Sequence, residues 1–181
     1  MAIDVTVEPA TFHLVDYDAD TIAALVAEAA GWFGFDGPIT VRVDEGSPLG
    51  DVVVESADPV VLAVEGGAFE DLKYIRKLSP VLVQTVVARV VGRIADRRHG
   101  FDAPPDAEIT TAQQDAWDAW LLGRASRHGL ALPQGRWRYR FRNRHGFTDA
   151  ADGVFDRLWN ADQLTWADLC RWCDETAAAR A

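Results

Sequence analysis

The order of apolar and polar positions predicts a helix and several strands in the first part of the chain. Residues 3–9 alternate weakly and indicate a short strand or extended arm. From residue 22 onward, apolar side chains recur at helical spacing after Asp18 or Asp20, either of which can cap a helix, and this pattern ends near Gly34. Three β-rich runs follow and predict neighbouring strands of one sheet, at 39–44, 51–56 and 59–67.

A long helix is expected after these strands. Ser79 can cap it, Pro80 suits its first helical position, and His99-Gly100 ends it. Its many β-branched residues are also typical of a strand, but the length of the run between a cap and a glycine favours a helix. The preceding residues 69–77 are interpreted as a helical turn or a loop.

Tryptophan-rich helical patterns dominate the remainder of the chain. Residues 110–129 predict an amphipathic helix, and residues 148–178 predict one or two short helices. Between them, residues 136–144 read RWRYRFRNR, which predicts a strand because its side chains alternate in type. One face of this strand would carry only arginines: Arg136, Arg138, Arg140, Arg142 and Arg144. The opposite face is expected to enter the core, with Trp137, Tyr139, Phe141, Asn143 and His145.

These elements together predict an α+β fold. A small mixed β-sheet is packed by the long central helix, and a Trp-rich helical region follows. We expect residues 1–103 to form the α/β core. Residues 104–181 would be the C-terminal helical region with its Arg-rich strand, packed on the core as a single domain.

Charge is distributed unevenly along this chain of 181 residues, whose formal net charge is −10. Residues 1–72 hold fifteen acids against the single base Arg42, whereas residues 89–145 hold eleven arginines against six acids. The acidic balance disfavours nucleic acid as a partner, because long-range attraction follows the field of the whole protein. A local basic strip could still bind a small anion.

The sequence also favours a cytoplasmic location without a membrane partner. No apolar run is long enough to cross a bilayer, and the start MAIDVTVEP lacks the basic and apolar regions of a secretory signal. Cys170 and Cys173 form a C-x-x-C pair within a helical pattern, for which packing is the favoured interpretation. Metal binding and redox chemistry remain alternatives, although neither a helix N-terminus nor two further ligands accompany the pair.

Common catalytic signatures are absent from the sequence. It contains no G-x-S-x-G, no G-x-x-x-x-G-K and no G-x-G-x-x-G. We therefore assign no catalytic residue, no cofactor and no metal ligand.

The order of helix, three strands and long helix over residues 18–99 resembles the core of minimal zincin-like metallopeptidases. In that family the long helix carries H-E-x-x-H, whose two histidines bind zinc and whose glutamate acts as base. Here Arg89 and Arg93 stand at the positions of the two ligands, Val90 at that of the base, and Gly92 matches a glycine of the family's motif. Guanidinium offers no lone pair to a metal ion, so the resemblance implies a degenerate, inactive site. The former cleft would be lined by Arg89, Arg93 and His99.

The arginine row needs negative charge nearby, because five adjacent cations repel one another. Acids of the same chain or of a second copy would satisfy it, and an anionic small molecule or an acidic protein partner are the alternatives. Single-stranded nucleic acid fits less well, since the aromatic side chains would lie on the opposite face from the arginines.

Two functions follow as hypotheses. The first is a non-catalytic binding or self-association protein on a degenerate zincin-like scaffold, acting as a homodimer or with an acidic protein partner. The second is a hydrolase with an unconventional site near Arg89, Arg93 and His99.

Overall fold

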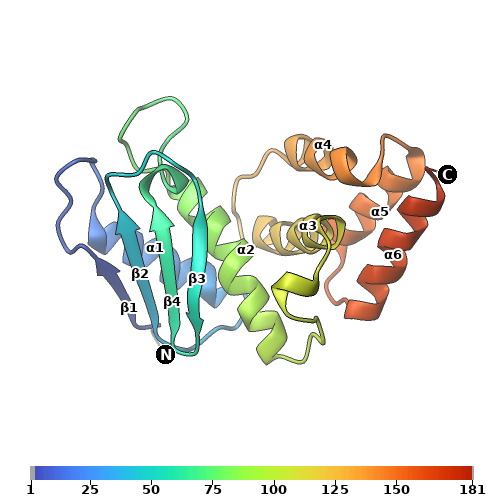
Figure 1. Cartoon of the computed structure of the whole chain (residues 1–181), viewed down its shortest axis with the longest axis horizontal. Coiled ribbons are helices and arrows are strands. Elements are labelled where there is room, and N and C mark those ends of the chain that lie inside the picture. Colours follow the sequence, from blue (N-terminus) through green and yellow to red (C-terminus); the bar gives the residue numbers. More distant parts are fainter. Residues whose placement is uncertain (1–2, 181) are drawn as a thin grey trace. The chain divides into compact units, whose positions relative to one another are not determined.

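A computed structural model describes residues 3–180, and the chain divides into two compact units. Unit 1 ends at Ala95 and unit 2 begins at Asp96, so the division falls within the long helix α2 (Pro80–Arg98). From the sequence, the first part is expected to end at residue 103. The predicted α+β fold is confirmed: unit 1 contains a mixed sheet, and helices make up most of unit 2 (Figure 1).

Unit 1 contains one sheet of four strands and a helix between the first two. In chain order its elements are β1 (Val5–Glu8), α1 (Ala19–Gly31), β2 (Ile39–Asp44), β3 (Val52–Ala57) and β4 (Val60–Glu65). The strand order is β1-β2-β4-β3, in which β1, β2 and β4 are parallel and β3 is an antiparallel edge. The parallel strands therefore end on the same side, and the connections that follow them gather there.

Alternation along the central strands makes the sheet one-sided. Ile39, Val41 and Val43 of β2 are buried, and so are the corresponding residues of β4. Both α1 and α2 lie behind the strands in Figure 1, which leaves the front face without a helix. Burying those apolar side chains under the helices stabilises unit 1 through the hydrophobic effect.

The sequence signals for the helix ends in unit 1 match the structure. Asp18 caps α1, because its carboxylate accepts the backbone N–H of Thr21 at 2.7 Å. Ser79 precedes α2, where its hydroxyl accepts the N–H of Leu82 at 3.4 Å. Gly34 follows α1 with a φ of +67°, a conformation that glycine adopts without a Cβ clash.

A closed loop connects β4 to α2. After a short 3₁₀ turn (Gly66–Ala68), residues 70–77 leave the sheet and return. The N–H of Asp71 donates to the carbonyl of Lys77 at 2.8 Å, which ties the two ends of the loop together. The N–H of Asp16 donates to the backbone carbonyl of Arg76 at 2.8 Å. This bond holds the loop against the segment after β1.

Unit 2 is a helical bundle arranged around one buried helix. Its helices are α3 (Thr111–Arg127), α4 (Gln134–His145), α5 (Asp149–Asn160) and α6 (Trp166–Ala178), and α3 packs against the other three. Gly123 of α3 allows α5 to approach closely, since a Cβ there would lie 2.1 Å from the carbonyl oxygen of Trp159. The region 148–178 thus forms two helices.

The predicted arginine strand at 136–144 is wrong, because this segment is helix α4. Its most buried residues, Phe141 and His145, are four positions apart, which is helical spacing. Tyr139, expected in the core, is 59% exposed. The alternation misleads because arginines on different sides of a helix can each meet a carboxylate from a neighbouring helix, so their spacing does not define one polar face.

Candidate functional site

The arginines of α4 pair with acids of the same unit. Arg142 binds Asp152 of α5, with its Nε 2.7 Å from one carboxylate oxygen. Arg138, one turn earlier, contacts Asp156 and lies 3.7 Å from Asp152. These contacts join α4 to α5, and the guanidinium of Arg142 lowers the pKa of Asp152.

Two further arginines face α3 instead. Arg140 and Arg144 lie 3.3 and 3.7 Å from the carboxylate of Asp115, whose side chain is buried. Burial raises the pKa of Asp115, and the charge of Arg140 acts against that rise. Arg136 is exposed at the start of the helix. Four of the five arginines therefore meet acids of their own chain, which leaves little of this row for an outside anion.

The residues of the expected degenerate cleft lie in different units. Arg89 and Arg93 are half-buried on α2 within unit 1, one turn apart. His99 follows the end of α2, belongs to unit 2 and is exposed. Among the residues that the structure describes, no group of three or more His, Cys, Asp or Glu could hold a metal ion.

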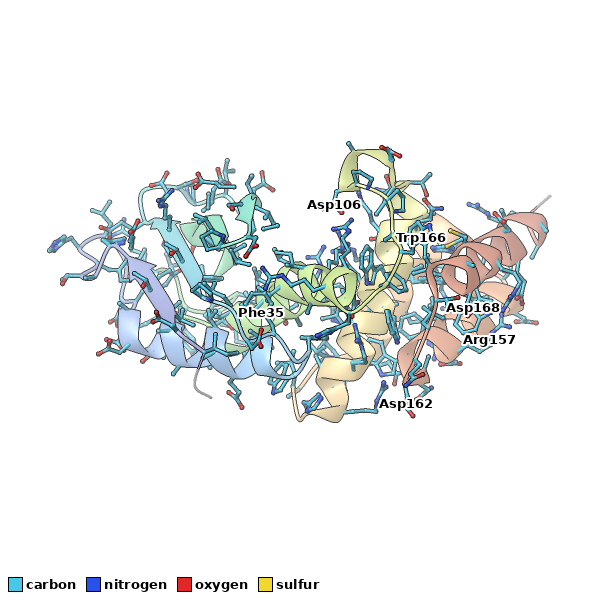
Figure 2. All side chains as sticks on the ribbon, turned by 90° about the horizontal axis from the view of Figure 1, so that it is seen from below. Phe35, Asp106, Arg157, Asp162, Trp166 and Asp168 are labelled. Carbon is cyan, nitrogen blue, oxygen red and sulfur yellow. The ribbon has the colours of Figure 1, made fainter. Side chains whose placement is uncertain are left out.

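His99 borders a depression of about 640 Å³ in unit 2. Asp102, Asp162 and Trp166 also line it, and Figure 2 labels the last two, with Asp162 before the start of α6. At its base the buried Asp96 accepts hydrogen bonds from Arg124 at 2.7 Å and from the indole of Trp117 at 2.8 Å. In this network the carboxylate of Asp96 serves as the counter-charge of Arg124, which is a structural role.

The C-x-x-C pair lies in the middle of α6. Cys170 is half-buried and Cys173 is buried, and both thiols are free. Burial raises the pKa of both thiols, that of Cys173 to about 12. Because the thiolate is the reactive species, this environment favours packing over redox chemistry.

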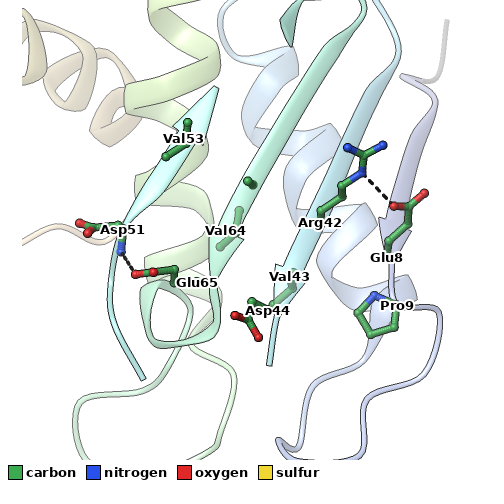
Figure 3. A pocket seen from close by; sticks show the side chains of 10 residues that line it. Glu8, Pro9, Arg42, Val43, Asp44, Asp51, Val53, Val64 and Glu65 are labelled. Carbon is green, nitrogen blue, oxygen red and sulfur yellow. Dashed lines mark hydrogen bonds and ion pairs between the residues drawn. The ribbon is translucent and has the colours of Figure 1, made fainter. Parts of the chain in front are cut away.

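A groove lies on the helix-free face of the sheet in unit 1. One row of cross-strand neighbours passes through all four strands and contains Glu8, Arg42, Ala63 and Val53. A second row, nearer the ends of β2 and β4, contains Asp44, Glu65 and also Asp51, which directly precedes the antiparallel β3. Side chains two positions apart on a strand share a face, so both rows face outward. Together with Pro9, Val43 and Val64 they enclose about 710 Å³ (Figure 3).

The groove combines an apolar floor with an acidic rim. Val53 is 58% exposed although it lies within a strand. Arg42 is neutralised by Glu8 at 3.0 Å and by Glu55 at 2.7 Å. Asp44, Asp51 and Glu65 have no ion pair with a cation among residues 3–180. The rim therefore keeps an uncompensated negative charge beside exposed apolar surface.

This groove is not among the sites that the sequence pattern predicts. A usable signal was present, because β1, β2 and β4 each end in an acid: Glu8, Asp44 and Glu65. What the pattern alone could not supply was the strand order, which brings these three ends together.

No protein-family model matches the chain, and the searches of curated proteins and of solved structures gave no match either. Separately, none of the helices described for residues 3–180 is both long and apolar enough to cross a membrane.

Proposed function

We propose that this chain is a cytoplasmic, non-catalytic binding protein on a degenerate zincin-like scaffold, and that unit 1 binds a basic polypeptide segment with apolar side chains in its groove. The observation that carries the proposal is the groove itself: a helix-free sheet face with exposed Val53 beside three carboxylates that no cation of the described residues neutralises. Alternate side chains of an extended segment can place apolar groups on the floor and cations at the rim.

The scaffold part of the proposal is supported by the element order in unit 1. A helix, three strands and the long helix α2 follow one another in the order that resembles the core of minimal zincin-like metallopeptidases. Arg89 and Arg93 occupy the positions of the two ligands on α2, and neither can coordinate a metal ion. The proposed binding face is the side of the sheet opposite α2, so it does not depend on that lost site.

A binding titration tests the proposal. The probe is a short fluorescent peptide in which lysine alternates with leucine, isoleucine and valine, and the control peptide has glutamate in place of each lysine. We expect only the basic peptide to raise the fluorescence anisotropy on binding, and Asp51→Lys to weaken its affinity about tenfold.

Asp36→Lys is the matched control for this titration. Asp36 is exposed before the start of β2, at the opposite end of the strand from Asp44, so the variant changes the net charge equally without altering the groove. Equal weakening by both variants, or equal binding of both peptides, would show that the groove is not the binding site.

The second hypothesis, a hydrolase, is favoured only by the depression at His99, where an exposed imidazole and Asp102 lie beside Trp166. Elemental analysis of protein never exposed to a chelator tests it together with the scaffold. Stoichiometric zinc would contradict the loss of the metal site.

A further inference from the structure

The groove has a complementary surface on the same unit, the loop 70–77. Three large apolar side chains of this loop are strongly exposed: Leu72 (74%), Tyr74 (65%) and Ile75 (82%). Clustered exposed apolar residues of this size mark interaction surfaces far more often than single ones do.

The loop is also a segment of this acidic unit in which bases outnumber acids, with three bases against Glu70 and Asp71. It contains both lysines of the chain, Lys73 and Lys77, together with Arg76. Lys77 is paired with Asp16, whereas the side chains of Lys73 and Arg76 make no ion pair among the described residues. Two cations without an ion pair thus lie among three exposed apolar side chains. The loop therefore matches the groove in apolar character and is opposite to it in charge.

Hydrogen bonds hold the loop in shape. One bond ties the two ends of the loop. In addition, the carboxylate of Asp71 accepts the backbone N–H of Lys73 at 2.7 Å, and the backbone N–H of Lys77 donates to the carbonyl of Tyr74 at 3.1 Å. A loop that is ordered before binding loses less conformational entropy when it docks.

We propose that the occupant of the groove is the loop 70–77 of a second copy of this chain. This inference rests on the proposed function and names its partner. Leu72 and Ile75 of one copy cover Val53 and the groove floor of the other, and Lys73 and Arg76 meet Asp44, Asp51 and Glu65. Both surfaces lie at the end of the sheet where the parallel strands finish, so two such contacts related by a two-fold axis close the assembly as a dimer.

Mixing of two variants tests the pairing of the two surfaces. Ile75→Asp alters only the loop, and Val53→Asp alters only the groove; both residues are exposed, so neither substitution opens the core. We expect each variant alone to weaken self-association about tenfold, as sedimentation measures it. An equimolar mixture regains dimers, because one intact loop and one intact groove remain.

Tyr139→Asp is the control, since it replaces a large side chain of unit 2 that is 59% exposed, close to the 58% of Val53, and should leave the dimer unchanged. A wild-type chain that stays monomeric, or a mixture that regains nothing, overturns the inference. A monomeric chain that still binds the basic peptide leaves the proposed function standing, so the two failures can be told apart.

Cross-linking locates the contact independently. A carbodiimide joins a lysine amine to a carboxylate in direct contact, and among residues 3–180 the amine of Lys73 has no ion pair, whereas that of Lys77 is paired with Asp16. In a mixture of ¹⁵N-labelled and unlabelled chains, we expect mixed-label links from Lys73 to Asp44, Asp51 or Glu65. The inference is overturned if Lys73 forms mixed-label links only to other acids. It is also overturned if the links to Asp44, Asp51 or Glu65 form at full yield in about 0.5 M salt.

Discussion

Burial determines the chemistry of His145 at the scale of a single residue. The imidazole is fully buried in unit 2 and stacks on Phe141, with ring centroids 3.8 Å apart. Its Nε2–H donates to the carbonyl of Ala112 at 2.9 Å, and its Nδ1 lies 2.8 Å from the hydroxyl of Thr176. Desolvation lowers the pKa of His145 from 6.5 to about 4, so the folded protein holds it neutral at pH 7.

This shift predicts a pH dependence of stability. Between pH 4 and the ordinary value of 6.5, the imidazole binds a proton in the unfolded chain but not in the folded one. The free energy of unfolding therefore rises with pH through this window, and His145 contributes a loss of roughly 3 kcal/mol when the pH falls from 7 to 4. Denaturant unfolding followed by tryptophan fluorescence measures it, since six of the seven tryptophans lie in unit 2.

His145→Gln should remove this part of the pH dependence while lowering stability at pH 7. The exposed His99 gives the control, because His99→Gln should keep the wild-type slope. If the His145 variant kept that slope, some other group would be responsible for it.

At the scale of an element, α4 depends on its neighbours. It begins without a side-chain cap and carries five arginines, of which Arg138 and Arg142 repel each other across one turn. Asp152 and Asp156 of α5 and Asp115 of α3 offset this repulsion. The helix is therefore stabilised mainly by ion pairs and by the burial of Phe141 and His145, and less by its own propensity.

We accordingly expect Arg142→Ala to lower the free energy of unfolding by about 1 kcal/mol, because a partly exposed, bidentate pair with Asp152 is lost. Arg136→Ala, which removes an exposed arginine from the same helix, should change it by less than about 0.5 kcal/mol. Chemical denaturation at low and high salt measures both. A cost for Arg142→Ala that persists after Asp152→Ala would contradict the assignment of this pair.

At the scale of the whole molecule, the chain consists of two compact units that share the helix α2. Each has its own buried apolar residues: the sheet and its helices in unit 1, and the residues around α3 in unit 2. Separate cores are expected to open as separate cooperative units.

A core substitution in unit 1 tests this division. Leu62 lies on the covered face of β4 and is 1% exposed, so Leu62→Ala should destabilise unit 1 by about 3 kcal/mol. Hydrogen exchange followed by mass spectrometry should show lower protection in β2 and β4 and unchanged protection in α3 and α5. Equal loss of protection in all four elements would mean that the chain unfolds as one unit.

The sequence by itself determined the local elements wherever capping and periodicity agree. Asp18, Ser79 and Pro80 define the starts of α1 and α2, and strict alternation defines β2 and the face of it that is buried. These signals are local, because a cap or an alternating run acts within a few residues of itself. The α+β class follows from them. The absence of the common catalytic motifs is likewise read directly from the sequence.

Tertiary structure alone decided the state of residues 136–144 and the position of the groove. An alternating row of arginines and aromatics suits a strand as well as a helix, and the choice was made by carboxylates on α3 and α5. The groove likewise exists because the strand order β1-β2-β4-β3 brings Glu8, Asp44, Asp51 and Glu65 to one end of the open face. Ion pairs and sheet register join residues far apart in the chain, and no local pattern encodes which partners will meet.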